Sequence, residues 1–427
     1  MRPLTLGSIA LLCATPLIVG AQTVAITGGR VYTMTGAPID NGTVILRDGR
    51  VAEVGANVAV PAGAQRIDAT GKIVTPGFIN SATELGLVDI GLERDTRDQS
   101  ARGKDNIAAA FTVWEGFNPA SVYLAPARNE GITTVVIAPS GGIIAGQAAV
   151  VDLVKGSISD MLVRAPVAMI ADVADHQNNG PSARGELLVR LRELLEDTRA
   201  YSRRKADYER AATRDFAASR LDLEAMIPVV EGREPLVVAA DRASDIEAAL
   251  RIAREYNLKL IIAGGAEGWL VADKLAAAHV PVFTGAMSNI PSSFSTLGSY
   301  QENAAQLKRA GVDVVLIGDA GTGDAETFNV RNLKQEAGNA VAYGMSWDDA
   351  LRAVTIVPAR VLGIGDRYGS LEAGKVANVV VWSGDPFEFS SRAEHVFVRG
   401  TEIGTPSRQD MLEQRYRTLP PDYRKPQ

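Results

Sequence analysis

The sequence predicts an α/β protein: a (β/α)8 barrel with a small composite β-sandwich formed by both ends of the chain. Two observations lead to this fold class. Apolar runs alternate with helical segments through the middle of the chain, which is typical of a parallel sheet. Short stretches of alternating apolar and polar residues occur near both ends instead, which indicates a smaller, half-exposed sheet.

The first 21 residues have the pattern of a secretory signal peptide. Met1 and Arg2 supply a positive start, residues 4–19 are apolar, and small residues precede Gln22. We therefore expect an exported protein, located in a bacterial periplasm, with no membrane span in its mature form. The single cysteine, Cys13, lies within this segment, so the mature chain has no disulfide.

The β-sandwich is expected from residues 22–72 and 365–405. The first part contains TVAITGGRVYTM and GTVILRDGRVAEVG, and the second contains SLEAGKVANVVVWSGDP and EHVFVRG. Residues 406–427 are predicted to be a C-terminal tail.

The barrel is predicted over residues 73–364, because eight continuous apolar runs suit strands that are buried on both faces. These runs cover residues 73–79, 133–138, 148–153, 167–171, 236–240, 260–263, 282–284 and 314–317. A doubly wound sheet is the alternative, but no glycine-rich phosphate fingerprint follows the first run.

The charge of the chain argues against nucleic acid as a partner. The net charge is −6, and the sequence contains no concentrated basic patch.

Catalytic groups of a barrel lie at the carboxyl ends of its strands, so the polar residues there are the candidate site. Glu84, Asp241 and Asp319 follow the first, fifth and eighth runs and are the candidate catalytic residues. The candidate pocket residues are Asn80, His176, Arg242, Glu267 and Trp269. Asp172 also follows the fourth run.

Several motifs resemble the amidohydrolase superfamily, and within it the imidazolonepropionase-like branch. They are IDATGKIVTPGFIN, NEGITTVVIAPSGG, GQAAVVDL, DRASDIEAALRIAREYNLKLIIAGGAEGW, GVDVVLIGDAG and the closing MSWDDALRAVTIVPARVLGIGDRYGSLEAGKVANVVVWSGDP. The resemblance covers most of the mature chain. It implies a (β/α)8 barrel and hydrolysis of non-peptide, often cyclic, C–N amide bonds, with divalent metals held by histidines.

The resemblance also implies where the metal ligands of the family would fall, and nearly all of them are replaced. The strand-one H-x-H pair falls on Ala82 and Glu84, and the strand-five and strand-six histidines fall on Ala239 and Gly264. The strand-four lysine falls on Ala168, while the strand-eight aspartate is retained as Asp319. With only three histidines in the chain, a family-type histidine site cannot be assembled.

Three interpretations follow. In the first, the protein is a non-catalytic or strongly altered member that acts in binding or assembly with an active relative. In the second, Glu84, Asp241 and Asp319 form a rebuilt carboxylate site that uses acid–base catalysis or a hard divalent cation. In the third, it is an ordinary metal-dependent amidohydrolase.

The first interpretation is preferred. It implies no cofactor, or at most a divalent cation on carboxylates. The expected partners are a small-molecule ligand and either a second copy of the chain or a catalytically intact paralogue.

Overall fold

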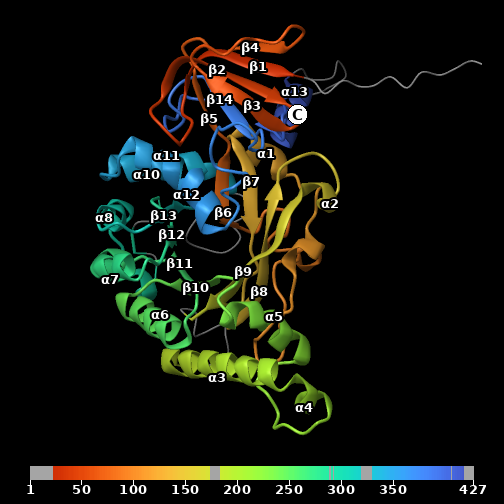
Figure 1. Ribbon diagram of the computed structural model, residues 1–427, viewed down its shortest axis with the longest axis vertical. Helices are drawn as coiled ribbons and strands as arrows, with labels where there is room; N and C mark the ends of the chain where they lie inside the picture. The colour runs from red at the N-terminus through yellow and green to blue at the C-terminus, as the bar shows by residue number, and fades with distance from the viewer. Residues whose placement is uncertain are drawn as a thin grey trace, which may run out of the picture.

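The computed structural model describes residues 23–173, 183–287, 290–291, 293–318, 329–404 and 406–417. Two sheets of eight strands each organise the molecule. The smaller, sandwich-forming sheet lies at one end of the long axis, and the barrel extends below it (Figure 1). The expected signal peptide, His176, Asp319 and the end of the expected tail lie outside the described residues.

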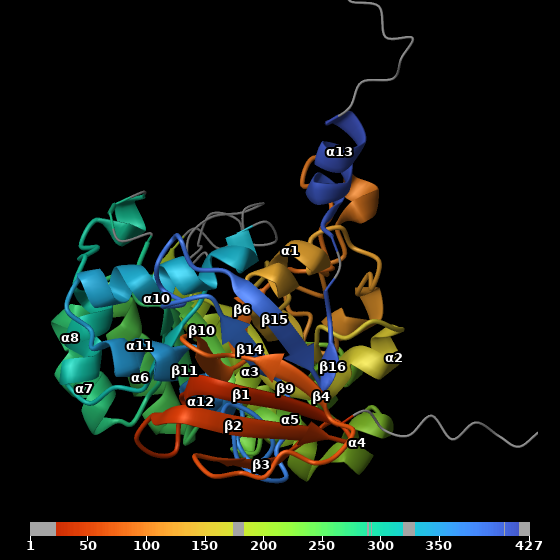
Figure 2. The same ribbon diagram turned by 90° about the horizontal axis from the view of Figure 1, so that it is seen from above.

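The sandwich sheet combines strands from both ends of the chain. β14 pairs with β5 and β15, so the returning C-terminal segment is joined to the N-terminal strands by main-chain hydrogen bonds. Figure 2 shows these red and blue strands side by side. The strands are β1 (Val24–Val31), β2 (Ile39–Arg47), β3 (Arg50–Gly55), β4 (Gln65–Asp68), β5 (Ile73–Pro76), β14 (Val379–Trp382), β15 (Ala393–Val398) and β16 (Thr401–Glu402).

The barrel sheet runs in chain order from β6 to β13 and is nearly closed. Its strands are β6 (Phe78–Thr83), β7 (Ile132–Ile137), β8 (Ile144–Asp152), β9 (Leu162–Asp172), β10 (Leu236–Ala240), β11 (Leu260–Gly264), β12 (Val282–Thr284) and β13 (Val314–Leu316). The expected barrel is confirmed, but its strands are not all parallel. β8 pairs antiparallel with both β7 and β9, because a tight connection through Gly141 and Gly142 replaces the expected crossover.

The first predicted barrel strand, 73–79, is wrong as a single element. The chain divides at Gly77: β5 belongs to the sandwich sheet, and β6 begins the barrel. The amide of Gly77 donates to the carbonyl of Asn378, and a Cβ at this position would overlap the side chain of Thr133. Glycine therefore allows the backbone to pass closely between the two sheets.

Helices surround the barrel, except α13, which lies beside the sandwich sheet (Figure 1). They are α1 (Leu124–Asn129), α2 (Ile158–Met161), α3 (Arg184–Arg203), α4 (Lys205–Glu209), α5 (Arg220–Val230), α6 (Ala243–Tyr256), α7 (Ala272–Ala277), α8 (Asn303–Arg309), α10 (Leu333–Ala342), α11 (Trp347–Ala353), α12 (Ile356–Val361) and α13 (Arg408–Tyr416). Short 3-10 turns cover Arg94–Thr96, Val113–Gly116, Gly268–Val271, Phe294–Thr296 and Asn329–Asn332. No helix in these described ranges is both long and apolar enough to cross a bilayer.

The interior of the barrel is a separate apolar core. Side chains from the strands, among them Ile79, Val237, Ile261 and Phe283, form one cluster. Residues of α12 and of the segment after it join the same cluster and close the N-terminal end of the barrel. They are Val357, Ala359, Leu362, Ile364 and Tyr368. The barrel interior is thus packed along its axis by these side chains.

Candidate functional site

The carboxyl ends of seven barrel strands meet at one mouth, where the candidate residues were expected. On β6, Asn80 is fully buried and serves the closure of the barrel. Its Nδ2 donates to the carbonyl of Val330 at 3.4 Å, and its Oδ1 accepts from the amide of Gly318 at 3.4 Å. Asn80 therefore joins β6 to the residues around β13.

Ala82 lies on the same strand, and Glu84 follows its last residue, Thr83. Ala82 packs, partly buried, against the apolar barrel interior. The side chain of Glu84 is 6% exposed, and its carbonyl accepts from the amides of Leu87 and Val88. Glu84 thus begins a turn that directs the chain away from the strand end.

Asp241 follows β10 and lies over the end of the neighbouring strand. A Cβ added to Gly264 would lie 2.5 Å from its Oδ1. Gly264 itself has φ +86°, a conformation that residues with a side chain rarely adopt. The Asp241 carboxylate therefore occupies the space that a side chain at position 264 would need.

The carboxyl group of Asp241 has few donors. Its Oδ1 accepts from the amide of Ala266 at 3.3 Å. Burial raises the pKa of Asp241 to about 6; the Ala266 hydrogen bond opposes this rise, and the nearby charges of Asp172, Asp245 and Glu267 add to it. Asp241 can therefore gain or lose a proton near neutral pH.

The acidic neighbourhood of Asp241 differs from the expected set. The carboxylates that contribute most to its raised pKa are Asp172, Asp245 and Glu267. Asp172 reaches this position because it ends β9 and pairs in register with Ala239 of β10. The sequence placed Asp172 after a strand, but only the strand pairing brings it beside Asp241.

Glu267 is held by the backbone on both sides of it. Its Oε2 accepts from the amide of Ala243 at 2.9 Å, at the start of α6, and its own amide donates to the carbonyl of Asp241. Glu267 thus stabilises the N-terminus of α6 and links that helix to the 3-10 turn after β11. Arg242 is the residue immediately before α6, and its carbonyl accepts from the amides of Asp245 and Ile246.

Trp269 is fixed at the edge of the mouth. Its Nε1 donates to the carbonyl of Gly298 at 2.9 Å, and its ring lies 4.9 Å from the ring of Tyr300. Phe294 and Leu297 of the same loop are exposed. The indole therefore anchors the loop that follows β12.

The described residues contain no group of three or more histidine, cysteine, aspartate or glutamate side chains arranged to hold a metal ion. Ala168, at the expected lysine position, is buried inside the barrel, and Ala239 is partly buried at its mouth. What the structure does bring together is a group of carboxylates around Asp241, beside small side chains.

Known proteins were compared with this fold and site. The Amidohydrolase family model matches residues 265–403. Amidohydrolase tasK from Hapsidospora irregularis is 23% identical over 394 residues, which cover 84% of this chain; the chain spans only 39% of that protein. Imidazolonepropionase from Erwinia tasmaniensis is 26% identical over 401 residues, covering 85% of this chain and 90% of that protein.

Among solved structures, an amidohydrolase from Thermotoga maritima MSB8 superimposes with a TM-score of 0.79 at 27% identity. The match covers 89% of this chain and 99% of that one. Phenylurea hydrolase B superimposes with a TM-score of 0.54 at 19% identity, which shows a shared fold alone.

Proposed function

Because this chain belongs to the amidohydrolase superfamily as an imidazolonepropionase-like member, we propose that it has given up histidine-bound metal hydrolysis and acts in binding or assembly with a catalytically intact relative. The family reaction is hydrolysis of non-peptide, often cyclic, C–N amide bonds. The proposal keeps the family ligand class, an amide-containing small molecule at the mouth, and assigns the chemistry to the partner.

The donor set does not fit a histidine-bound metal. The positions that correspond to the family ligands carry Ala82, Glu84, Ala168, Ala239 and Gly264. Aliphatic side chains and a glycine supply no lone pair to a metal ion. Three of these positions pack against the barrel interior or are partly buried beside it, so they have become part of its wall.

The observation that carries the proposal is the relation of Gly264 to Asp241. A ligand at position 264 would need a backbone that L-residues rarely adopt and would overlap the Asp241 carboxylate. On this proposal, the end of β11 has changed in backbone as well as in side chain. Reversal of a single substitution would not restore the family geometry.

A second candidate is an enzyme with a rebuilt carboxylate site, favoured by the raised pKa of Asp241. A carboxyl group with a pKa of about 6 is mostly ionised at pH 7 and accepts a proton readily. In this scheme Asp241 removes a proton from an attacking water molecule, while Asp172 and Glu267 maintain its basicity. The notion of an ordinary metal-dependent amidohydrolase has the least support from the residues present.

The test compares assembly with hydrolysis. The tagged full chain is purified from its native cell, and co-purifying proteins are identified by mass spectrometry. The proposal expects enrichment of a relative that contains the H-x-H motif, and no hydrolysis of a panel of cyclic amides by the isolated chain. Hydrolysis by the isolated chain would overturn it.

The same assay separates the second candidate. Metal-independent hydrolysis that is lost in Asp241→Asn and retained in Glu84→Gln would assign catalysis to the Asp241 group. Glu84→Gln is the comparison variant because Glu84 follows β6, which is not adjacent to β10 in the barrel sheet.

A further inference from the structure

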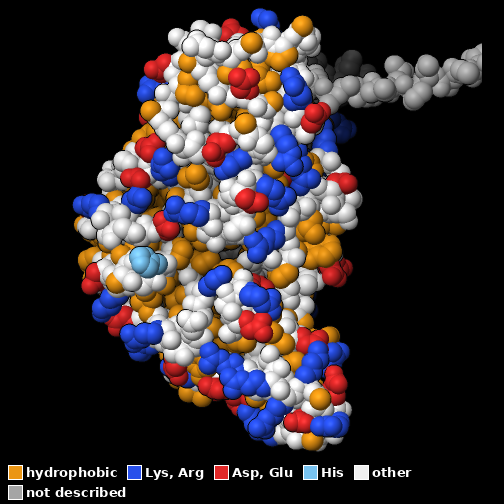
Figure 3. Space-filling view, in the orientation of Figure 1, with side chains coloured by type: hydrophobic (Ala, Val, Ile, Leu, Met, Phe, Trp, Pro, Cys, Tyr) orange, Lys and Arg blue, Asp and Glu red, His pale blue; other side chains and the backbone are white. Residues whose placement is uncertain are grey.

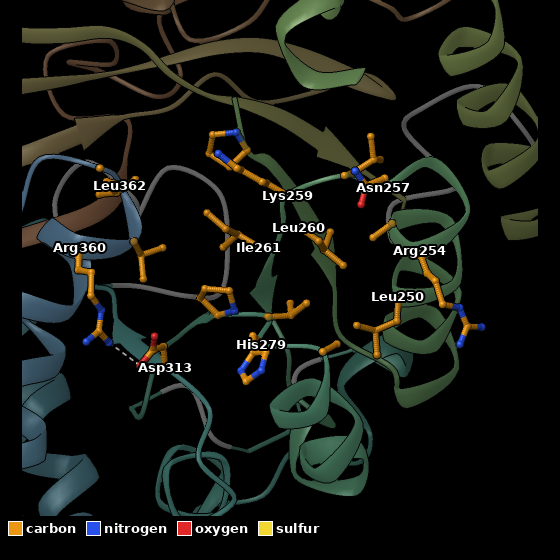
Figure 4. Close-up of a pocket in the computed structure, with 18 of the residues that line it drawn as sticks. Leu250, Arg254, Asn257, Lys259, Leu260, Ile261, His279, Asp313, Arg360 and Leu362 are labelled. Carbon is orange, nitrogen blue, oxygen red and sulfur yellow. Dashed lines mark hydrogen bonds and ion pairs between the residues drawn. The ribbon is translucent and has the colours of Figure 1, made fainter. Parts of the chain in front are cut away.

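A large cavity lies at the opposite end of the barrel from the mouth. Its volume is about 1040 Å3, and it is lined by the N-terminal ends of β9, β10 and β11, the segments that lead into β12 and β13, and the ends of α6, α7 and α12 (Figure 4). Cavities of this size accommodate a drug-sized organic ligand. None of the candidate residues of the mouth lines it.

The alternation of side chains along the strands explains what faces this cavity. Val237, Ile261, Phe283 and Val315 point into the barrel interior. The residues two positions earlier come immediately before these strands, and continuing the alternation places them on the axis side at the N-terminal end. They are Pro235, Lys259, Pro281 and Asp313, and all four line the cavity.

The cavity is rich in positive charge. Seven lysine and arginine residues line it, against two acidic residues, which is a formal excess of five positive charges in a chain whose net charge is −6. The cations are Arg164, Arg233, Arg251, Arg254, Lys259, Lys274 and Arg360, and the acids are Glu247 and Asp313. His279 also lines the cavity.

The sequence contains no concentrated basic patch, but the fold brings separate cations together around this cavity. The cations are dispersed from residue 164 to residue 360, so only the fold gathers them. Figure 3 shows lysine and arginine side chains spread over the face that also carries a histidine.

Several of these cations already have partners. Arg360 pairs with Asp313 at 2.6 Å, drawn in Figure 4, and Lys274 pairs with Glu247 at 2.5 Å. Arg164 donates to the carbonyl of Gly363 at 3.0 Å.

Lys259 is different. The side chains of Lys259 and Arg254 form no hydrogen bond or ion pair within the described parts of the chain, although the backbone carbonyl of Lys259 accepts from the amide of Leu236. In Figure 4, Lys259 lies between Leu362, at the end of α12, and Asn257, at the end of α6. Among the four inward-facing residues of this end, it carries the only charge without a partner.

Apolar side chains form the walls around Lys259. Leu260, Ile261, Val280 and Leu362 are each less than 8% exposed, and Pro281 completes the surface. An unpaired ammonium group above apolar walls suits a ligand that has both a negative group and an apolar body.

We propose that this cavity binds an organic anion, with its carboxylate or phosphate group paired to Lys259 and its apolar body against the Leu260–Pro281–Leu362 wall. Arg254 adds positive charge at the rim. The site is separate from the proposed function of the mouth, and it requires no chemistry there. The limited size of the cavity and the acids among the cations favour a small molecule over a nucleic acid.

The test uses the fluorescent anion 8-anilinonaphthalene-1-sulfonate with the folded full chain. This probe combines a sulfonate with an apolar ring system. We expect Lys259→Gln to weaken its binding about five- to tenfold, because a charge-assisted contact is lost. Added salt should also weaken binding to the wild type more than to the variant, which keeps the other cations of the cavity.

Lys155→Gln is the matched control, because Lys155 is exposed, follows β8 at the same end of the barrel, and does not line the cavity. Competition then identifies the ligand chemistry. Octanoate and octyl phosphate should both displace the probe, and the one that does so at lower concentration shows whether the site prefers a carboxylate or a phosphate. Inorganic phosphate, which has no apolar body, should not displace the probe at equal concentration.

Equal probe affinity in the wild type and Lys259→Gln would overturn the proposal, provided that circular dichroism shows both to be folded. An equal loss in Lys155→Gln would also overturn it. Displacement by a single-stranded oligonucleotide at lower concentration than octyl phosphate would assign the surface to nucleic acid instead.

Discussion

Two aspartates at opposite ends of the barrel, Asp152 and Asp241, show how hydrogen-bond donors decide what a buried carboxylate can do. Asp152 ends the antiparallel strand β8, so it lies at the N-terminal end, while Asp241 follows β10 at the mouth. Asp152 is surrounded by donors, and Asp241 has acids for neighbours. Asp152 stabilises the contact between the two sheets, whereas Asp241 has a pKa close to neutral pH.

Asp152 is fully buried and joins the barrel to the sandwich. Its carboxylate accepts from Thr134 Oγ1 at 2.8 Å, Tyr368 Oη at 2.8 Å, Asn378 Nδ2 at 3.1 Å and Arg399 Nε at 2.6 Å. Burial, and then the Asp152 charge, raise the pKa of Tyr368. Such a network stabilises the ionised carboxylate and fixes the two sheets relative to one another.

The mouth is the contrary case. Among the described residues, Asp241 accepts one long backbone hydrogen bond, and the charges of Asp172, Asp245 and Glu267 raise its pKa, so its ionised form is poorly stabilised. A site with this character costs stability at neutral pH, which is common where a fold retains a functional surface.

The largest expected effect is at Asp152. Asp152→Ala removes the acceptor from four donors and leaves Arg399 without its carboxylate, so the free energy of unfolding should fall by about 3 kcal/mol. Urea unfolding measures it. Asp366→Ala is the control, since Asp366 is exposed and 4.0 Å from Arg367, and it should change little. A change at Asp152 no larger than in this control would contradict the structural role of the network.

Gly264→Ala should cost about 2 kcal/mol, because the new methyl group needs a disfavoured φ and meets the Asp241 carboxylate. Gly311→Ala separates the two causes: Gly311 has φ +94° and open space around its Cβ position, so it reports the backbone cost alone. The excess cost at position 264 should disappear in an Asp241→Ala background. If it persists there, Asp241 does not fill this space.

Asp241→Asn should stabilise the protein at pH 7.5 by about 1–2 kcal/mol. The pKa of Asp241 is raised from 3.8 to about 6 on folding, so the folded state binds more protons, and stability falls as the pH rises from 4 to 6. Asp241→Asn cannot ionise, so its stability should not fall over this pH range. Near pH 4, where Asp241 is mostly protonated in the folded wild type, the two proteins should have similar free energies of unfolding. Chemical unfolding at the two pH values checks the sign; stabilisation only at pH 4 would be incompatible with it.

A smaller effect of the same sign is expected at Glu234, beside the cationic cavity. Burial raises its pKa to about 7, while Arg164 and Arg233 oppose the rise. The wild type should therefore lose stability between pH 4.5 and 7, and Glu234→Gln should be more stable by about 1 kcal/mol at pH 8. Thermal unfolding of the wild type and the variant at the two ends of this pH range measures the effect. Glu231→Gln, at an exposed neighbouring position, is the control.

The sequence was sufficient for the fold but not for strand direction. An apolar run such as 148–153 suits a buried strand whether it pairs parallel or antiparallel with its neighbours. The sequence therefore could not predict that β8 is antiparallel. The change of sheet at Gly77, within the run 73–79, could not be predicted for a similar reason. An apolar run indicates that a segment is buried, but it does not indicate which sheet the segment joins.

For the site, the sequence predicted which residues follow the strands. The family resemblance also predicted that Ala82, Ala239 and Gly264 occupy positions where the family has metal-binding histidines. It did not predict that Asp172 joins Asp241, because that depends on the register between β9 and β10. The cavity around Lys259 was missed for a stronger reason, since its charges come from segments up to about two hundred residues apart in the printed sequence.

The most direct test of the central claim is the metal content of the purified full chain after incubation with zinc and dialysis, measured by mass spectrometry. The account predicts that zinc does not remain bound in stoichiometric amount, because the family ligand positions supply no histidine. One tightly held equivalent that is lost in Asp241→Asn would contradict it and restore a metal-dependent hydrolase.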